Sequence, residues 1–293
     1  MRYLIAALLV FAFSASANED GWFPISLKDK YVHIPITLNG IETTAILDTG
    51  TVSNYISKDF VAKHGSNLSK GGVTKIANSW DDEFYQVYNE VPIKIFDTEF
   101  KMDDLIESDL PSGDVVIGMH FFRFYILQVD YPNKQIRMLD RKSVNMKKYN
   151  NIESRVEGDH GVPIVKLSVN KEKDAWFLLD TASPLGLTID RSLSEKRDWL
   201  RDYKTGRVTL KELNQEVEMN QLEIPMLKIG PFEIEKIATA VPDKGHSLDL
   251  RPRYEKSFSR IKGKKLRGSV GFDVLKHFIV TIEYQTGFVH ISG

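Results

Sequence analysis

Two short stretches of this 293-residue sequence carry side chains that could act together on a reactive bond. They are Asp48-Thr49-Gly50-Thr51 and Asp180-Thr181-Ala182-Ser183, and each follows an apolar run and places an aspartate before two hydroxyl residues. A single Asp-Thr-Gly arises by chance in roughly one chain in twenty of this length. Two such elements are much rarer, which favours a pair of functional carboxylates over the alternative of two structural turns.

The chemistry available to such a pair depends on a shared proton. Two carboxylates at hydrogen-bonding distance cannot both ionise, so the pair holds one proton over a broad acidic range. The ionised member can deprotonate a water molecule while the protonated member donates a proton to a carbonyl oxygen. This chemistry requires neither a metal ion nor a covalent intermediate.

The sequence repeats once, and the repeat gives the two motifs equivalent positions. Gly118 is followed twelve residues later by Asp130-Tyr131, a turn and an apolar strand. Gly271 is followed twelve residues later by Glu283-Tyr284, a turn and an apolar strand. Each half has about 130 residues, an ordinary domain size. The polar stretch 141–159 is interpreted as the linker between the halves.

The elements that must hold these motifs are mostly short strands. Runs rich in β-branched and aromatic residues, separated by turn residues, predict strands at 31–38, 43–47, 90–96, 125–130 and 135–139. Short helices are predicted over 57–64, 119–124 and 191–200. The sequence therefore predicts a mainly β fold.

Composition limits the kinds of partner. The 39 Lys and Arg balance 40 Asp and Glu to a net charge of -1, which argues against nucleic acid as a partner. The chain has no cysteine, and its seven histidines lack metal-ligand spacing, so we expect no metal site and no cofactor.

The first seventeen residues have the pattern of a signal peptide. Arg2 is followed by an apolar run over 3–13, and Ala15-Ser16-Ala17 fits a signal-peptidase site. The run is too short to span a bilayer. We expect a mature chain from Asn18, periplasmic or secreted, that does not insert in a membrane after the signal is removed.

The motifs resemble those of the aspartic proteases of the pepsin and retropepsin superfamily. The resemblance covers nearly all of residues 29–293 and includes the segments Val116-Ile117-Gly118 and Ser269-Val270-Gly271. It implies an acid protease fold of two homologous β-barrel-like lobes, 18–145 and 146–293, related by a pseudo-two-fold axis. It also implies an endopeptidase that acts on a peptide or protein substrate, and we expect the protein to be a monomer.

The resemblance also assigns roles to single residues. Asp48 and Asp180 would be catalytic, Thr49 and Thr181 would interlock the two aspartate loops, and Thr51 and Ser183 would hydrogen-bond the carboxylates. The sequence departs from the family where Ala182 replaces the usual second glycine, the counterpart of Gly50. A methyl group there could crowd the loop or strain its backbone. The alternative is therefore a catalytically silent protein of the same fold that binds extended peptides.

The family further implies a hairpin flap over the substrate. The corresponding segment is 73–91, with its turn at 78–82 and Trp80, Tyr85 or Tyr88 as the aromatic residue that contacts substrate. An ordinary hairpin whose aromatic rings pack on the lobe is the equal alternative.

Overall fold

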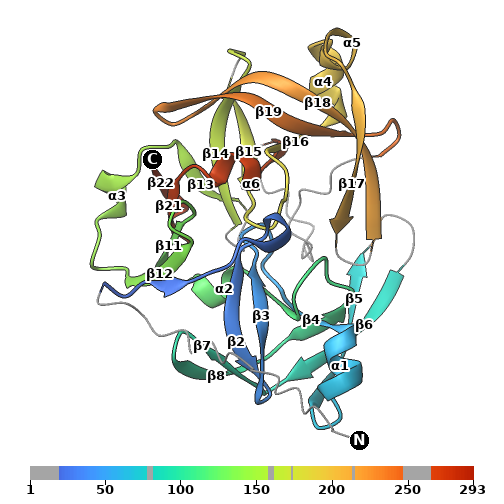
Figure 1. The fold of residues 1–293 in the computed structure, drawn as a ribbon, viewed down its shortest axis with the longest axis vertical. Helices are drawn as coiled ribbons and strands as arrows, with labels where there is room; N and C mark the ends of the chain where they lie inside the picture. The colour runs from blue at the N-terminus through green and yellow to red at the C-terminus, as the bar shows by residue number, and fades with distance from the viewer. Residues whose placement is uncertain (1–19, 78–81, 158–161, 173, 213–214, 247–264) are drawn as a thin grey trace, which may run out of the picture.

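The computed structural model describes residues 20–77, 82–157, 162–172, 174–212, 215–246 and 265–293. The expected signal peptide, 1–17, lies outside the described residues. Figure 1 shows a mainly β chain, as the sequence predicts, with a lobe at each end of the long axis. Within the described part of the chain, no helix is long and apolar enough to cross a membrane.

The first lobe is built on one large, mixed sheet. Among the described residues it has nine strands, in the order β5 (Ser69–Ala77), β6 (Asp82–Asn89), β9 (Leu105–Ser108), β4 (Asn54–Ser57), β10 (Val115–Ile117), β3 (Ile41–Leu47), β2 (His33–Leu38), β7 (Val91–Ile95) and β8 (Thr98–Met102). Its core includes Ile34, Leu47 and Ile117, which are fully buried.

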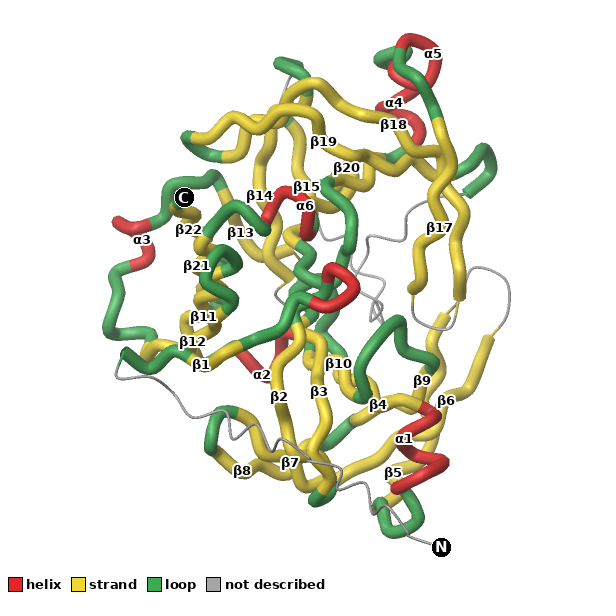
Figure 2. The backbone as a smooth tube through the Cα atoms, in the orientation of Figure 1, coloured by secondary structure: helices red, strands yellow, loops and turns green. Residues whose placement is uncertain are grey.

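The second lobe repeats this plan. Its sheet has eight strands within the described ranges, in the order β13 (Ser154–Glu157), β14 (Val162–Val169), β15 (Ala175–Leu179), β20 (Leu266–Val270), β16 (Leu187–Ile189), β19 (Phe232–Pro242), β18 (Gln215–Ile229) and β17 (Gly206–Glu212). The parallel pair β15–β20 corresponds to the parallel pair β3–β10 of the first lobe. In Figure 2 this sheet lies at the opposite end of the molecule from β2 and β3.

A third sheet joins the two halves. Its five strands in the described residues are β1 (Phe23–Pro24), β12 (Gln135–Asp140), β11 (Tyr125–Asp130), β21 (Ile279–Glu283) and β22 (Phe288–Ser292), in that order.

The register of this shared sheet has two-fold symmetry. The antiparallel pair β11–β21 places Gln128 opposite Thr281, and these residues are equivalent in the sequence repeat. Their side chains are hydrogen-bonded, with Gln128 Nε2 donating to Thr281 Oγ1 at 2.9 Å. The pseudo-two-fold axis that the repeat implies therefore passes between these two strands.

The helices are short. They are α1 (Lys58–His64), α2 (Met119–Phe122), α3 (Met146–Tyr149), α4 (Arg191–Lys196), α5 (Trp199–Asp202) and α6 (Phe272–Leu275), with a 3-10 turn at Lys28–Lys30. Helix α1 has the predicted caps: the Ser57 side chain accepts from Phe60 N–H, and Gly65 follows the last turn.

Two predictions about elements need correction. The helix predicted over 191–200 is two helices, because Asp198 adopts a left-handed φ of 59° that ends one helix before the next begins. Asp tolerates this conformation better than most residues. The stretch 141–159, interpreted as a linker, contains α3 and β13, and β13 pairs with β14 of the second lobe.

Candidate active site

Each aspartate follows a strand that enters the site beside a parallel neighbour. Asp48 comes directly after β3, and its backbone N–H donates to Ile117 O at 3.0 Å. Asp180 comes directly after β15, and its N–H donates to Val270 O at 3.0 Å. The two loops therefore leave their sheets in the same way, as the two-fold symmetry requires.

Reciprocal hydrogen bonds join the two loops through Thr49 and Thr181, both fully buried. Thr49 Oγ1 donates to Leu179 O at 2.5 Å and accepts from Thr181 N–H at 2.9 Å. Thr181 Oγ1 donates to Leu47 O at 2.7 Å and accepts from Thr49 N–H at 3.1 Å. This is the interlock that the family resemblance implies, and it fixes the two aspartate loops relative to each other.

The two carboxyl groups meet at Gly50. The N–H of Gly50 donates to Asp48 Oδ1 at 2.7 Å, and the N–H of Ala182 donates to Asp180 Oδ1 at 2.9 Å. A methyl carbon placed on Gly50 would lie only 3.0 Å from Asp180 Cγ. Gly50 therefore binds one carboxylate through its N–H and packs directly against the other.

Two further glycines let the chain pass close behind the aspartate loops. A side chain on Gly118 or on Gly271 would overlap the carbonyl oxygen of Ser53 or Ser183, respectively. The neighbouring N–H groups complete this packing, since Met119 N–H donates to Thr51 O at 2.9 Å and Phe272 N–H donates to Ser183 O at 2.8 Å.

The hydroxyl residues of the motifs also lie in the loops. Thr51 Oγ1 accepts from Ser53 N–H at 3.3 Å, and Ser183 N–H donates to Asp180 O at 3.4 Å. Ser183 is buried and Thr51 is half-buried. The hydrogen bonds from these hydroxyls to the carboxylates stay a prediction.

Ala182 fits its loop without backbone strain. It is not among the described non-glycine residues with positive φ, and Gly50 does not have a left-handed φ either. Its methyl group packs against a small apolar cluster of the first lobe that includes Tyr55, Tyr85 and Val116. The replacement of glycine by alanine therefore adds a contact between the second aspartate loop and the first lobe.

The segment predicted to be a flap is a hairpin of β5 and β6. Trp80 lies outside the described residues. Tyr85 is 6% exposed in the cluster that Ala182 contacts, and Tyr88 lies in the main core with its hydroxyl donating to Glu107 Oε2 at 2.9 Å. The rings of Tyr85 and Tyr88 thus pack on the lobe, as the alternative interpretation of the hairpin expects, whereas Phe84 of the same hairpin is exposed. A contact between this hairpin and substrate remains a prediction.

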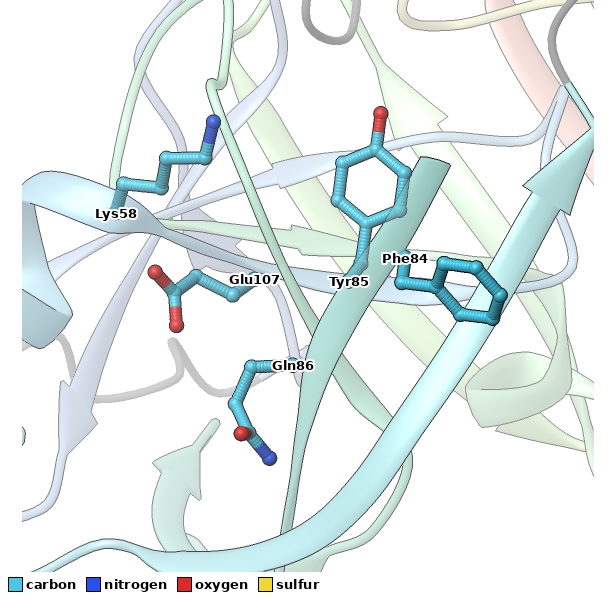
Figure 3. A pocket seen from close by; sticks show the side chains of 5 residues that line it. All are labelled: Lys58, Phe84, Tyr85, Gln86 and Glu107. Carbon is cyan, nitrogen blue, oxygen red and sulfur yellow. The ribbon is translucent and has the colours of Figure 1, made fainter. Parts of the chain in front are cut away.

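A pocket of about 390 Å³ lies beside this hairpin. Its lining is mixed, with apolar and charged side chains from β6, β9 and the start of α1: Lys58, Phe84, Tyr85, Gln86 and Glu107. In Figure 3, Lys58 and Glu107 lie on one side of the pocket and Phe84 on the other. Lys58 Nζ is paired with Asp109 Oδ2 at 2.8 Å.

Sequence reasoning gave no role to two tyrosines near the aspartates. Tyr131 and Tyr284 follow β11 and β21 at equivalent places and are almost completely buried. The signal was present in the sequence, because Asp130-Tyr131 and Glu283-Tyr284 occupy the same register of the repeat. Nothing in that register indicated that the charge of an aspartate acts on each phenol.

Comparisons with known proteins agree with this geometry. The family model described as "Retroviral aspartyl protease" matches residues 26–144. The crystal structure of the aspartic proteinase from Irpex lacteus is similar with a TM-score of 0.55 and 11% identity, over 93% of this chain and 96% of that one. No curated protein matches the sequence. The match over residues 26–144 and the shared two-lobed fold support the resemblance of this chain to the aspartic protease superfamily.

Proposed function

We propose that this protein is an aspartic endopeptidase that hydrolyses peptide bonds with a water molecule activated by Asp48 and Asp180. The observation that carries the proposal is the position of Gly50, whose N–H binds the Asp48 carboxylate at 2.7 Å while its Cα faces the Asp180 carboxyl. These contacts of one glycine with both carboxyl groups support a pair close enough to share a proton.

The roles of the loops follow from electrostatics. A backbone N–H that donates to a carboxylate favours its charged form, and here one N–H serves each aspartate. Since two adjacent charges repel, one proton stays on the pair. The ionised carboxylate takes a proton from water as the other donates to the scissile carbonyl, and the tetrahedral product collapses when the leaving amine is protonated.

The interlock of Thr49 and Thr181 supports this chemistry through preorganisation. The catalytic groups come from two different lobes, and a displacement of about 1 Å can cost roughly 100-fold in rate. Four hydrogen bonds across the lobes, 2.5–3.1 Å long, resist such a displacement.

The substrate in this proposal is an extended peptide. The pocket beside the hairpin would receive one of its side chains, with Phe84 and Tyr85 offering apolar contact and Lys58 and Glu107 offering charge. We also propose that the protein is exported and loses residues 1–17. The mass of the protein recovered from the expressing cell's exterior or periplasm tests this cleavage.

The decisive experiment is digestion of a denatured protein mixture by the mature chain, from acid to neutral pH. Mass spectrometry of new peptide termini measures cleavage. Asp48→Asn and Asp180→Asn should each reduce the rate by at least about 100-fold, because general acid–base catalysis contributes about that much or more. Full activity in either variant would contradict the shared role of the pair.

The second candidate function is peptide binding without hydrolysis. Ala182, which departs from the family's usual glycine, is the observation that favours it. If the wild-type chain leaves all substrates intact but binds denatured peptides in calorimetry, this candidate replaces the protease. The unstrained backbone of Ala182 and its N–H bond to Asp180 support the protease instead.

A further inference from the structure

Tyr131 and Tyr284 present an unusual pair of buried hydroxyl groups. The side chains are 1% and 3% exposed, and neither hydroxyl has a hydrogen-bond partner among the described residues. Removing a hydroxyl from water without a replacement hydrogen bond is unfavourable. Phenylalanine would fill the same space without this cost, so the two hydroxyls call for a hydrogen-bond partner beyond the side chains and backbone of the described residues.

The contacts of Tyr131 connect it to the opposite lobe. Tyr131 follows β11 of the first half, but its N–H donates to Phe278 O at 3.3 Å and its ring meets the ring of Phe272 edge-on, with centroids 6.1 Å apart. Phe272 begins α6 and donates its N–H to Ser183 O in the second aspartate motif. Tyr131 therefore packs against Phe272, the residue that holds the Asp180 motif of the other lobe through this hydrogen bond.

The electrostatic partners of the two phenols follow the same crossed pattern. Burial, and then the charge of Asp180, raises the pKa of Tyr131. Burial, then the charge of Asp48 and the neighbouring Tyr131 phenol, raises the pKa of Tyr284. The pKa of each tyrosine is thus raised by burial and then by the charge of the aspartate in the opposite lobe. Both phenols remain protonated hydrogen-bond donors over the whole pH range of an aspartic protease.

Water is the partner that fits these groups. Buried water typically makes about three hydrogen bonds to polar groups that would otherwise be unsatisfied. Each phenol hydroxyl can donate a hydrogen bond to a water molecule, and the negative charges that act on the phenols, those of Asp180 and Asp48, are acceptors for the water's own protons. A water molecule in this place would complete a link between the shared sheet and the aspartate loops.

We infer that Tyr131 and Tyr284 are positioning residues of the aspartate pair. Their hydroxyls bind internal water, which links the end of β11 to Asp180 and the end of β21 to Asp48. The water site is independent of hydrolysis, whereas the effect on the aspartates' proton rests on the proposed function. The experiments separate the two.

Thermal unfolding of Tyr131→Phe and Tyr284→Phe tests the water site in the intact mature chain. Each variant should lower Tm by about 2–4 °C, since a bound water loses a hydrogen-bond partner. The matched control is Tyr88→Phe, whose hydroxyl has Glu107 as a partner within the protein. An unchanged or higher Tm in both tyrosine variants would mean that the hydroxyls bind no water molecule, and it would overturn the inference.

Double-mutant cycles test the link to the aspartates without needing activity. The Tm loss of Tyr131→Phe should shrink in an Asp180→Asn background, and that of Tyr284→Phe should shrink in an Asp48→Asn background. Tyr88→Phe should lose the same amount in every background. Equal losses for the two tyrosines with and without the aspartates would overturn the positioning role.

The pH profile of kcat/KM supplies the readout in the active enzyme. Loss of a hydrogen bond to the ionised pair raises its pKa, so the acid limb of the profile should move to higher pH in both Phe variants but not in Tyr88→Phe. An unmoved acid limb would overturn the role in catalysis. If the wild-type chain cleaves nothing, the proposed function fails, and the cycles still decide the water link.

Discussion

At the scale of single residues, the two aspartate motifs are alike except at one position. Gly50 and Ala182 make the same N–H bond to the aspartate two residues before them, at 2.7 and 2.9 Å. The surroundings of the two residues differ. A methyl group on Gly50 would meet the Asp180 carboxyl, whereas the methyl group of Ala182 packs on an apolar cluster of the first lobe.

Gly50→Ala should therefore impair activity more than stability. The new carbon would lie 3.0–3.2 Å from three atoms of the Asp180 carboxyl group, so this carboxyl must move by a few tenths of an ångström. We expect kcat to fall by roughly 10-fold or more while Tm changes little, because misplacement of a catalytic group is costly. A Gly50→Ala enzyme with normal kcat would contradict this account of the site.

The reverse substitution, Ala182→Gly, should impair stability more than activity. It removes a methyl group that packs on the first lobe and adds backbone freedom to the unfolded chain, together worth about 1–2 kcal/mol. We expect a lower free energy of unfolding in denaturant titrations, with turnover preserved or raised. If Ala182→Gly alone creates activity in an otherwise inactive protein, the natural chain is the silent binder.

At the scale of elements, strands β3 and β15 are linked at their ends rather than along their lengths. Thr49 Oγ1 and Thr181 Oγ1 each satisfy one carbonyl and one N–H of the opposite loop. Each hydroxyl therefore holds two buried backbone groups that have no access to water. The strands position the aspartates only because these ends are tied together.

Thr49→Val and Thr181→Val should test this link. Valine keeps the shape but leaves a buried carbonyl and a buried N–H unsatisfied, at about 1–3 kcal/mol for each group. We expect each variant to lose about 2–4 kcal/mol in urea unfolding, and the double variant to lose less than the sum because the two residues share partners. Thr49→Ser keeps the hydroxyl and should stay near wild type. Strict additivity in the double variant would argue against the reciprocal arrangement.

At the scale of the whole molecule, the lobes meet in the shared sheet and in an ion pair between distant segments. Lys30 Nζ, in the turn before β2, binds Asp273 Oδ2 at 2.8 Å, and Lys276 Nζ binds the other oxygen of Asp273 at 2.9 Å. Burial by itself would raise the pKa of Asp273, but the hydrogen bonds and charges of the two lysines outweigh it and lower the pKa.

A lowered pKa makes this contact sensitive to acid. The stabilisation is present above the ordinary value of 3.8 and is lost as the pH falls through the lower value of the folded state. We expect Asp273→Asn to lower Tm by about 2–4 °C at neutral pH and to match the wild type in strong acid. Glu216→Gln is the control, because its pair with Lys211 is about two-thirds exposed on both sides and contributes little. An equal deficit at both pH values would contradict the ionic contribution.

Local patterns in the sequence were enough for part of this description. The repeat made Asp48 and Asp180 equivalent, the apolar runs predicted the strands before them, and Ser57 and Gly65 predicted the caps of α1. These features depend on side-chain type and on spacing over a few residues, where backbone geometry leaves few options. The prediction of one helix over 191–200 was wrong, because the left-handed φ of Asp198 leaves no trace in the spacing of apolar residues.

The tertiary structure decided which groups meet. Thr49 and Thr181 are 132 residues apart in the chain, and only the docking of two lobes about the β11–β21 axis brings them together. The same docking places Gly50 against Asp180 and turns Tyr131 toward the opposite lobe. The sequence determined the chemical groups and their symmetry, because these are local properties. The tertiary structure decided their contacts, because strand register and lobe docking depend on the packing of the whole core.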